Sequence, residues 1–444
     1  GDVYKRQIVV GETAARAALD RLTGLSVTPE VWEAWRDGHR REPSRDPEIG
    51  AIRVRNRSPV SDKIVLGRIR QRPGKPLDAD ALIEDLSRLY VLDYVDPITF
   101  DLEAGPDGVD LVIDVAERRA GLTSLQFGLS LEEDFRGGSG YVFDTRLQRL
   151  AVNHAGAEWR ADLKIGRQSG FRTDFYQPLD ARLRWFVDPF VYLDRRQQYV
   201  VDDGDRLAEI VLQEYGAGFE IGRNLGNWGR IAGSVTRGRS TGEVLVPEEL
   251  IPDEVNDVTG WNLSFGVDTL DDPVWPTAGL YADLRYVRTE TLLGGETETA
   301  DLISRVDWAL TAGRLTFVPG VQGALALDGG DELFRTVALG GEFRLSGLEP
   351  AELYGQQKFL ARLVTYYSLT GPTLGVLKPE WYVGVSLEAG DVFADGDPIV
   401  ANRLRTAGSV FLGSTSVLGP LRIGYGFAEG GRHRVYLALG RGLP

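Results

Sequence analysis

Leu122-Thr123-Ser124-Leu125-Gln126-Phe127-Gly128-Leu129-Ser130-Leu131 decides the fold, because apolar and polar residues alternate along it with a period of two. Successive side chains of an extended chain point to opposite faces, so Leu125, Phe127, Leu129 and Leu131 share one face. The other face takes Ser124, Gln126, Gly128 and Ser130. The stretch is therefore predicted to be a β-strand.

The same pattern recurs from about residue 121 to the C-terminus, as roughly ten alternating residues followed by a break rich in Gly, Asp and Asn. Clear examples run from Trp261 to Asp268 and from Trp381 to Glu388. About ten tilted residues are what a strand needs to cross a bilayer. We therefore predict a transmembrane antiparallel β-barrel rather than a soluble β-sandwich, whose strands also alternate.

The candidate strands number about sixteen, and an even number suits a bacterial barrel. Closing such a sheet on itself pairs the backbone polar groups inside the bilayer. The strands are predicted near residues 122–132, 140–151, 156–167, 170–179, 183–201, 206–222, 227–243, 259–270, 278–291, 298–312, 314–327, 357–369, 379–390, 403–413, 420–428 and 432–441.

Composition excludes several classes of protein. The formal net charge of −15 argues against a nucleic-acid partner, because a phosphate-binding surface needs clustered Lys and Arg. No run of 18 apolar residues occurs, which excludes an α-helical membrane protein. A barrel shows its lipid face only at alternate positions, so an apolar content of 43% does not conflict with one.

Cysteine is absent, which removes thiol catalysis, thiolate-bound zinc and disulfides. The three His residues, His39, His154 and His433, lie far apart in the sequence and lack the spacing of metal ligands. We expect no metal and no cofactor.

Residues 1–47 are expected to hold an artefactual start, the remnant of an upstream domain and a linker. Residues 1–7 resemble translated sequencing adapter, so we expect a fragment whose signal peptide lies upstream. Residues 8–45 carry a short apolar helical face together with Trp32 and Trp35. Between residues 36 and 47 the sequence is highly charged and contains two Pro residues, as a linker does.

Residues 48–119 form the next predicted unit, in the order strand, helix, helix, strand, strand. A short helix is predicted over residues 61–66, and a second helix follows Asp78, a candidate N-cap. Two strands then flank a turn at residues 105–108, Gly-Pro-Asp-Gly.

This unit resembles a POTRA domain, the periplasmic module that precedes certain outer-membrane barrels, most specifically in Pro-Gly-Lys-Pro-Leu at residues 73–77. The alternative is an unrelated small α+β domain. We expect the last strand to be an exposed edge that binds an unfolded strand by β-augmentation, unless it pairs only with its neighbour. The residues expected on that edge strand are Val109, Leu111, Ile113 and Val115.

One POTRA-like unit followed by about sixteen strands resembles the superfamily of BamA-type assembly proteins and two-partner-secretion transporters. Residues 268–279 resemble a turn that usually ends in Pro-Thr-Arg-Gly, and residues 418–426 with 436–441 resemble the closing hairpin. Residues 339–348 resemble the sixth extracellular loop, which folds back into the lumen. The resemblance implies that residues 120–444 form a barrel in the lipid of the bacterial outer membrane, with the POTRA domain in the periplasm.

The loop departs from the family in its anchoring residues. Where the family usually has Arg-Gly-Phe or Arg-Gly-Tyr, this sequence has Ser346-Gly347-Leu348, and its arginine, Arg344, lies earlier. We expect Arg344 and Gly347 to anchor the loop, with Glu388 on a polar-facing strand position as the partner of Arg344. The alternative is that Arg344 is a solvated charge. The sequence also ends in Gly-Leu-Pro, where such barrels usually end in an aromatic residue.

The sequence of this loop and of residues 427–431 most resembles the branch of the superfamily whose members carry a patatin-like phospholipase ahead of one POTRA domain. Such a lipase uses a Ser on an elbow between strand and helix, together with an Asp. Residues 328–330, Asp-Gly-Gly, have the form of the patatin Asp motif, but they fall in the loop region of the barrel, so we interpret them as a turn. We expect no catalytic residue in this chain.

We therefore predict a transporter or anchor that translocates or displays an attached N-terminal passenger, with a patatin-like phospholipase as the expected passenger. The alternative is a BamA-type factor that inserts other outer-membrane proteins, for which more POTRA domains would be expected upstream. A third possibility is an enzyme whose catalytic domain has been cut away. In each case the POTRA domain is expected to contact the passenger or client. A passive porin is disfavoured, because porins lack a POTRA domain.

Overall fold

The computed structural model describes residues 12–19, 26–38, 47–90, 92–133, 139–166, 168–202, 205–246, 254–291, 294–328, 337–370, 379–394, 396–415 and 419–439. Several expectations fall outside these residues. They concern the adapter-like residues 1–7, His39, most of the linker, residues 329–330 of the Asp-Gly-Gly motif, residues 418, 440 and 441 of the closing hairpin, and the end of the chain.

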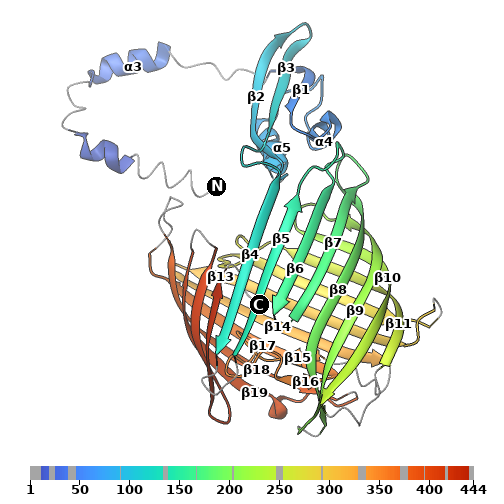
Figure 1. Cartoon of the computed structure of the whole chain (residues 1–444). Coiled ribbons are helices and arrows are strands. Elements are labelled where there is room, and N and C mark those ends of the chain that lie inside the picture. The colour runs from blue at the N-terminus through green and yellow to red at the C-terminus, as the bar shows by residue number, and fades with distance from the viewer. Residues whose placement is uncertain are drawn as a thin grey trace.

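Sixteen antiparallel strands close into one barrel, which confirms the predicted fold class (Figure 1). Each predicted strand is present, with ends shifted by a few residues. The strands are β4 Thr123–Glu133, β5 Ser139–Arg149, β6 Glu158–Gly166, β7 Gln168–Pro178, β8 Trp185–Asp202, β9 Asp205–Asn224, β10 Gly229–Val246, β11 Glu254–Asp268, β12 Gly279–Thr289, β13 Thr299–Ala312, β14 Leu315–Asp328, β17 Gln357–Ser368, β18 Trp381–Phe393, β19 Arg405–Ser414, β20 Leu421–Ala428 and β21 Arg432–Leu439.

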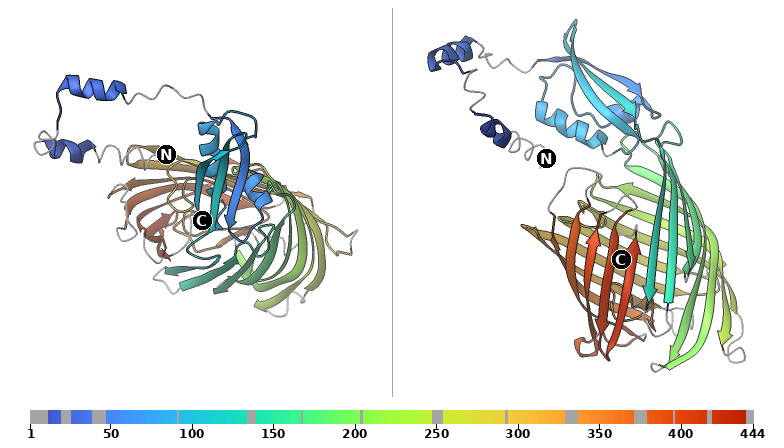
Figure 2. Two further views of the ribbon diagram at one scale, coloured as in Figure 1. Left: turned by 90° about the horizontal axis from the view of Figure 1, so that it is seen from above. Right: turned by 60° about the vertical axis from the view of Figure 1, so that its left-hand side comes forward.

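The barrel wall is uneven in height. Strand β9 has 20 residues, whereas β20 and β21 have 8 each. The last strand, β21, pairs with the first, β4, and so closes the sheet. The small N-terminal domain lies beyond one end of the barrel, over one side of its mouth (Figure 2). We call this end the domain end.

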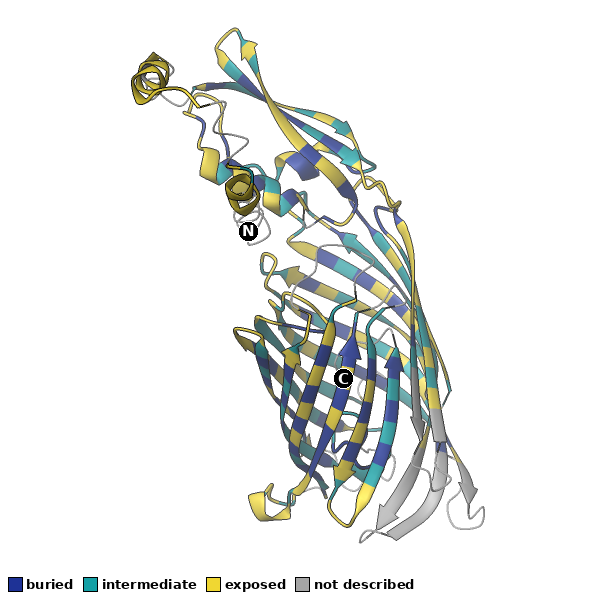
Figure 3. Ribbon diagram, turned by 90° about the vertical axis from the view of Figure 1, so that its left-hand side faces the viewer, coloured by how far each residue is buried: buried dark blue, intermediate teal, exposed yellow. Residues whose placement is uncertain are grey.

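Burial follows the alternation, because buried and exposed residues alternate along the barrel strands (Figure 3). In β18, Val385 is 47% exposed and Leu387 is 63% exposed. The residues that follow each of them, Ser386 and Glu388, are only 1% and 4% exposed. A soluble β-sandwich would bury the apolar face instead. The sequence alternation therefore marks the outside of a barrel, and the sandwich alternative is wrong.

The many Gly residues on the polar faces make room for aromatic rings inside the barrel. Phe186 of β8 lies over Gly222 of β9, and a Cβ on Gly222 would overlap the ring. The same holds for Phe411 of β19 over Gly384 of β18. Glycine beside a cross-strand aromatic residue is a known way to curve and pack a sheet.

Residues 47–118 fold into an α+β domain in the predicted order. Its elements are β1 Ile49–Arg57, α4 Asp62–Leu66, α5 Ala79–Tyr90, β2 Val95–Gly105 and β3 Gly108–Glu117. Asp78 caps α5, because its carboxylate accepts a hydrogen bond of 2.9 Å from the Ala81 amide.

The three-stranded sheet of this domain has the order β1-β3-β2, so β3 is its central strand. The expectation of an edge strand at Val109, Leu111, Ile113 and Val115 is therefore wrong. These residues pair with β1 in parallel on one side and with β2 antiparallel on the other. The chain between the parallel strands β1 and β3 runs through α4, α5 and β2, which is long enough for a parallel pairing. The edges of the sheet are β1 and β2.

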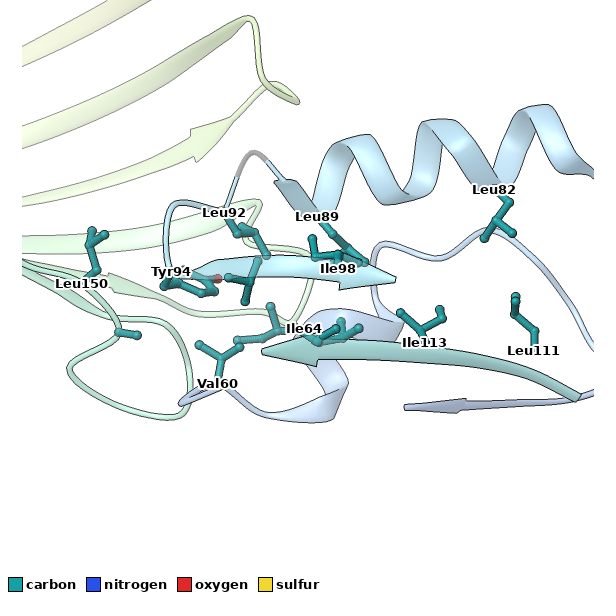
Figure 4. Close-up of a cluster of buried hydrophobic side chains, with 14 of the residues drawn as sticks. Val60, Ile64, Leu82, Leu89, Leu92, Tyr94, Ile98, Leu111, Ile113 and Leu150 are labelled. Carbon is teal, nitrogen blue, oxygen red and sulfur yellow. The ribbon is translucent and has the colours of Figure 1, made fainter. Parts of the chain in front are cut away.

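The α+β domain is joined to the barrel by one hydrophobic cluster (Figure 4). Tyr94 and Leu92 of the domain belong to the same cluster as Leu150 and Leu122 of the barrel. The Ser61 amide also donates to the carbonyl oxygen of His154 in the turn between β5 and β6, at 2.9 Å. The domain is thus docked on the barrel mouth by both apolar packing and hydrogen bonds.

Ahead of the α+β domain lies helix α3, Pro29–Gly38. Its Trp32 and Trp35 rings stack with centroids 5.1 Å apart, and both side chains are exposed. No helix among the residues that the structure describes is long and apolar enough to cross a membrane.

Candidate functional site in the barrel lumen

A loop between β14 and β17 folds into the barrel lumen. It begins with β15 Val337–Leu339, ends with β16 Leu353–Gly355, and these two short strands pair with each other. Strand β16 contacts β18 and also β8. Because β8 lies seven strands away from β17 around the wall, the loop crosses the lumen.

Glu388 of β18 binds this lumen loop through Ser346. Its carboxylate accepts hydrogen bonds from the Ser346 amide at 2.7 Å and from Ser346 Oγ at 2.6 Å. Ser386, on the same strand, also donates to it. All three side chains are buried. A charged acceptor in a buried site makes such hydrogen bonds strong, so this contact positions the centre of the loop.

Gly347 lies where the loop backbone touches the barrel wall. A Cβ at this position would overlap the backbone of β20 at Phe427 and Ala428. In the same way, a Cβ on Gly426 of β20 would overlap Ser346. The two glycines therefore allow the loop to lie directly against β20.

Arg344 is placed differently from our expectation. Its amide donates to the Gly341 carbonyl oxygen at 2.9 Å, and its guanidinium lies near enough to Lys358 for the two positive charges to repel. The described hydrogen bonds to Glu388 come from Ser346 and Ser386. The expected Arg344–Glu388 pair is thus replaced by a Ser346–Glu388 contact, because Ser346 offers both an amide and a hydroxyl at the point of closest approach.

Ion pairs hold the loop with acidic groups on the loop and basic groups on the wall. Arg422 of β20 donates to both carboxylate oxygens of Glu342, at 2.7 and 3.2 Å. Arg432 of β21 pairs with Glu352, and Arg434 Nη2 lies 3.9 Å from the Glu349 carboxylate. Three loop carboxylates, those of Glu342, Glu349 and Glu352, therefore face basic groups on the wall.

Arg362 of β17 links the loop to a second wall strand. It donates to the Asp307 carboxylate of β13 from Nη2 at 2.9 Å and from Nε at 3.3 Å, and from Nη1 to the Phe343 carbonyl oxygen at 3.4 Å. Arg305 also pairs with Asp307, at 2.6 Å. These buried charges are paired and hydrogen-bonded, as burial requires.

Aromatic rings connect the lumen loop to the turn between β11 and β12. Phe343 of the loop packs edge-on against Phe411, with centroids 5.1 Å apart. Trp275 of the turn stacks on Tyr382 at 4.5 Å and lies 6.3 Å from the same Phe411. The turn and the loop enter the barrel from opposite ends and meet at this aromatic cluster, which also includes Tyr366.

Sequence reasoning missed most of these anchors, although some left a signal. Trp275 is the aromatic residue of the turn at residues 269–278, and a large aromatic in a turn can indicate a return to the core. Arg422 and Arg434 occupy inward positions of their alternating strands, where a charge needs a partner. The partners themselves carry no local signal, because they lie far away in the sequence.

The expectation that this chain holds no catalytic residue overlooked a stretch with the spacing of a nucleophile elbow, Gly238-Arg239-Ser240-Thr241-Gly242, so the view that the motif is absent from the sequence is wrong. It lies inside β10 and pairs with β9 on one side and β11 on the other. An elbow requires a sharp turn from strand to helix. Its position therefore gives no support to catalysis, and no group of three or more metal-ligating side chains occurs among the described residues.

Comparisons with known proteins agree with this architecture. The POTRA family model, described as a surface antigen variable number repeat, matches residues 47–118. BamA from Haemophilus ducreyi lacking POTRA domains 1–3 is similar with a TM-score of 0.67 at 14% identity, over 88% of this chain and 84% of that one. CdiB from Acinetobacter baumannii is similar with a TM-score of 0.61 at 13% identity, over 88% of this chain and 73% of that one. CdiB from Escherichia coli is similar with a TM-score of 0.59 at 11% identity, over 89% of this chain and 76% of that one. No curated protein sequence matches the chain.

The predicted resemblance is confirmed at the level of the fold. Residues 47–118 match the POTRA model, and sixteen strands follow in a closed antiparallel barrel with a loop inside the lumen. The described part of the chain therefore has the fold seen in BamA and CdiB, and residues 47–118 match the POTRA model ahead of the barrel.

Proposed function

We propose that this protein is an outer-membrane barrel that moves polypeptide, translocating or displaying a passenger attached ahead of its POTRA domain. The observation that carries the proposal is the docking of the POTRA domain on the barrel mouth through the cluster that joins Leu92 and Tyr94 to Leu122 and Leu150. A module fixed at the entrance can deliver a bound chain to the lumen.

The outer surface supports a place in the membrane. Apolar side chains such as Leu263 and Val385 are exposed around the wall, and lipid would cover them. Trp159, Trp185 and Trp228 are exposed near the domain end. Aromatic belts of this kind mark a membrane–water interface. With this belt at one interface, the POTRA domain would lie outside the bilayer, and we place it on the periplasmic side.

The lumen argues against a passive pore. The loop crosses from β17 to β8 and is fixed by Glu388, Arg422 and Arg362. An open channel needs no such set of buried ion pairs. A moving chain would pass only after the loop shifts or the wall opens.

The seam between β4 and β21 is a candidate place for opening. Among the described residues these strands pair over five positions, from Val435 to Leu439, whereas β4 and β5 pair over eleven. Fewer ladder hydrogen bonds lower the cost of separating two strands.

A client strand would bind at an edge of the POTRA sheet, because the central strand β3 is already paired on both sides. Strand β2 is an edge, and its Phe100 and Leu102 are exposed. An edge offers unpaired backbone groups to an added strand. We place β-augmentation on β2.

The identity of the passenger is a second part of the proposal. The exposed, stacked Trp32 and Trp35 of α3 suggest a helix that packs on something else in the intact protein, and a patatin-like phospholipase domain is our candidate. The alternative, a BamA-type factor that inserts other barrels, is favoured by the exposed β2 edge, which would also accept a foreign strand.

A display assay tests the proposal. A signal peptide and an epitope-tagged, cysteine-free passenger are fused ahead of Glu48, and protease is added to intact Gram-negative cells. We expect the passenger to be cleaved outside the cell, whereas the same fusion without the barrel should stay protected. Protection of the passenger in cells whose barrel is folded in the outer membrane would refute display. Faster assembly of other outer-membrane proteins in those cells would then favour the alternative.

A further inference from the structure

A cleft of about 760 Å³ lies where the POTRA domain meets the barrel mouth. The POTRA side is formed by residues 67–72, Arg88 and residues 92–94. The barrel side is formed by strand ends and turns at the domain end, including Arg160 of β6 and Arg230 of β10. Gly67 touches the wall closely, because a Cβ there would lie 2.9 Å from the Ala181 carbonyl oxygen.

The lining of this cleft is strongly basic. Eight Arg side chains line it, against the two carboxylates of Asp93 and Glu158. Some of the arginines already have partners in the fold. Arg70 and Arg88 pair with Asp85, and Arg160 pairs with Asp174. Arg230 pairs in the same way with Glu220 on β9.

Two buried groups of the POTRA domain in this cleft lack hydrogen-bond partners within the described structure. They are Nη1 of Arg68 and the hydroxyl of Tyr94, whose residue is 2% exposed. Burial of the guanidinium lowers the pKa of Arg68, and Asp180 attracts it only weakly. A buried N–H group without an acceptor is costly, so an anion that accepts from Nη1 of Arg68 would relieve that cost.

Further arginines at the rim extend this charge toward the mouth. Arg72 and Arg182 line the cleft and are exposed, and neither forms an ion pair among the residues that the structure describes. With Arg68 they make three cations free to bind a ligand. A guanidinium binds a carboxylate through two parallel hydrogen bonds.

The cleft faces the lumen and not the lipid. Arg160 is an inward residue of β6, whereas the adjacent Trp159 points outward and is exposed. Asn224 and Arg230 likewise belong to the inward positions of β9 and β10. A lipid headgroup bound at the outer rim would meet Trp159 and Trp185 instead. A chain entering the barrel, in contrast, passes the cleft.

We propose that this cleft binds the carboxylates of an acidic, extended polypeptide segment at the entrance of the barrel. The proposal rests on the proposed function and names the chemistry of its client, a segment in which Asp or Glu recurs. Such a field of positive charge also steers acidic segments toward the mouth before they are bound. Binding should therefore weaken as the salt concentration rises.

The test measures the binding of a short peptide to the full chain in non-ionic detergent by fluorescence anisotropy. The probe is the octapeptide Ser-Glu-Gly-Glu-Ser-Glu-Gly-Glu with a neutral dye, and the control peptide carries Gln for each Glu. We expect the acidic peptide to bind at least tenfold tighter. Arg68→Gln should weaken binding about tenfold, which corresponds to about 1.4 kcal/mol.

Two further variants keep the test independent of folding. Arg72→Gln and Arg182→Gln alter exposed side chains, so they should leave the POTRA domain docked and still weaken binding together about tenfold. Arg119→Gln removes an exposed arginine outside the cleft and should leave the affinity unchanged.

Equal binding of the two peptides, or equal affinity of the Arg72/Arg182 and Arg119 variants, would overturn the proposal. Displacement of the peptide by inorganic phosphate, but not by chloride at the same ionic strength, would identify a phosphate site and would also overturn it. Failure of the display assay with intact peptide binding would contradict the proposed function alone.

Discussion

Replacing Arg422 by Gln should release the lumen loop. Arg422 is 1% exposed and donates two hydrogen bonds to the Glu342 carboxylate, at 2.7 and 3.2 Å. The variant leaves that carboxylate buried without its cation, which costs about 3–5 kcal/mol. The loop can avoid this cost by leaving the lumen for water. Since about 1.4 kcal/mol corresponds to a factor of ten, the population of the open loop should then rise by about two to three and a half orders of magnitude.

Trypsin measures this opening, because Arg344 lies inside the loop and a protease cuts segments that open. The full chain in detergent micelles is digested briefly, and mass spectrometry follows the fragment that begins at Leu345. Arg403→Gln is the matched control. It breaks an exposed pair with Asp397, which contributes about 0–1 kcal/mol, so the cleavage rate should rise about fivefold at most.

A double variant distinguishes loss of the ion pair from general damage. Arg422→Gln with Glu342→Gln leaves no buried charge unpaired, so most of the protection should return. Cleavage of Arg422→Gln at the wild-type rate would refute the anchor. A double variant cut faster than the single variant would show that packing of the Arg422 side chain, rather than the ion pair, holds the loop.

Three other perturbations should act on the same region. Trp275→Ala should lower the free energy of unfolding by about 3–5 kcal/mol in a gel-shift unfolding assay, whereas Trp228→Ala, which removes an exposed ring, should change it little. Gly347→Ala should cost about 1–3 kcal/mol and speed trypsin cleavage, because its Cβ overlaps β20, whereas Gly266→Ala, where the nearest atom is 3.9 Å away, should not. Partial burial would raise the pKa of Asp271, but hydrogen bonds from Thr277 and Ala278 outweigh it and lower the pKa below 3.8. The stability that this turn gains from Asp271 is therefore present above pH 3.8 and is lost as the pH falls through the lowered pKa, and Asp271→Asn should abolish that step in tryptophan fluorescence.

The strands could be predicted because the two sides of the wall demand different chemistry at every second residue. Leu125 and Phe127 are both exposed on the outside, as the alternation indicates, and Glu388 is inside. The hairpin of β2 and β3 could also be predicted, because its turn has the sequence Gly-Pro-Asp-Gly.

Long-range partners could not be predicted in the same way. The pair Glu342–Arg422 joins residues 80 positions apart, and Ser346 binds Glu388 partly through its backbone amide, which no side-chain pattern reveals. The parallel pairing of β1 with β3 likewise depends on where α4 and α5 pack, so the edge of the POTRA sheet was assigned to the wrong strand.

The most direct test of the central claim is to trap a polypeptide inside this barrel. A passenger fused ahead of Glu48 is stalled by a tightly folded domain, and a photocrosslinking amino acid is placed either at Ser234 or at its neighbour Val235 in β10. Ser234 is buried and faces the lumen, whereas Val235 is 51% exposed on the outside. We predict an adduct between barrel and passenger from position 234 and none from position 235. Adducts at neither position, or equally at both, would contradict passage of polypeptide through the lumen.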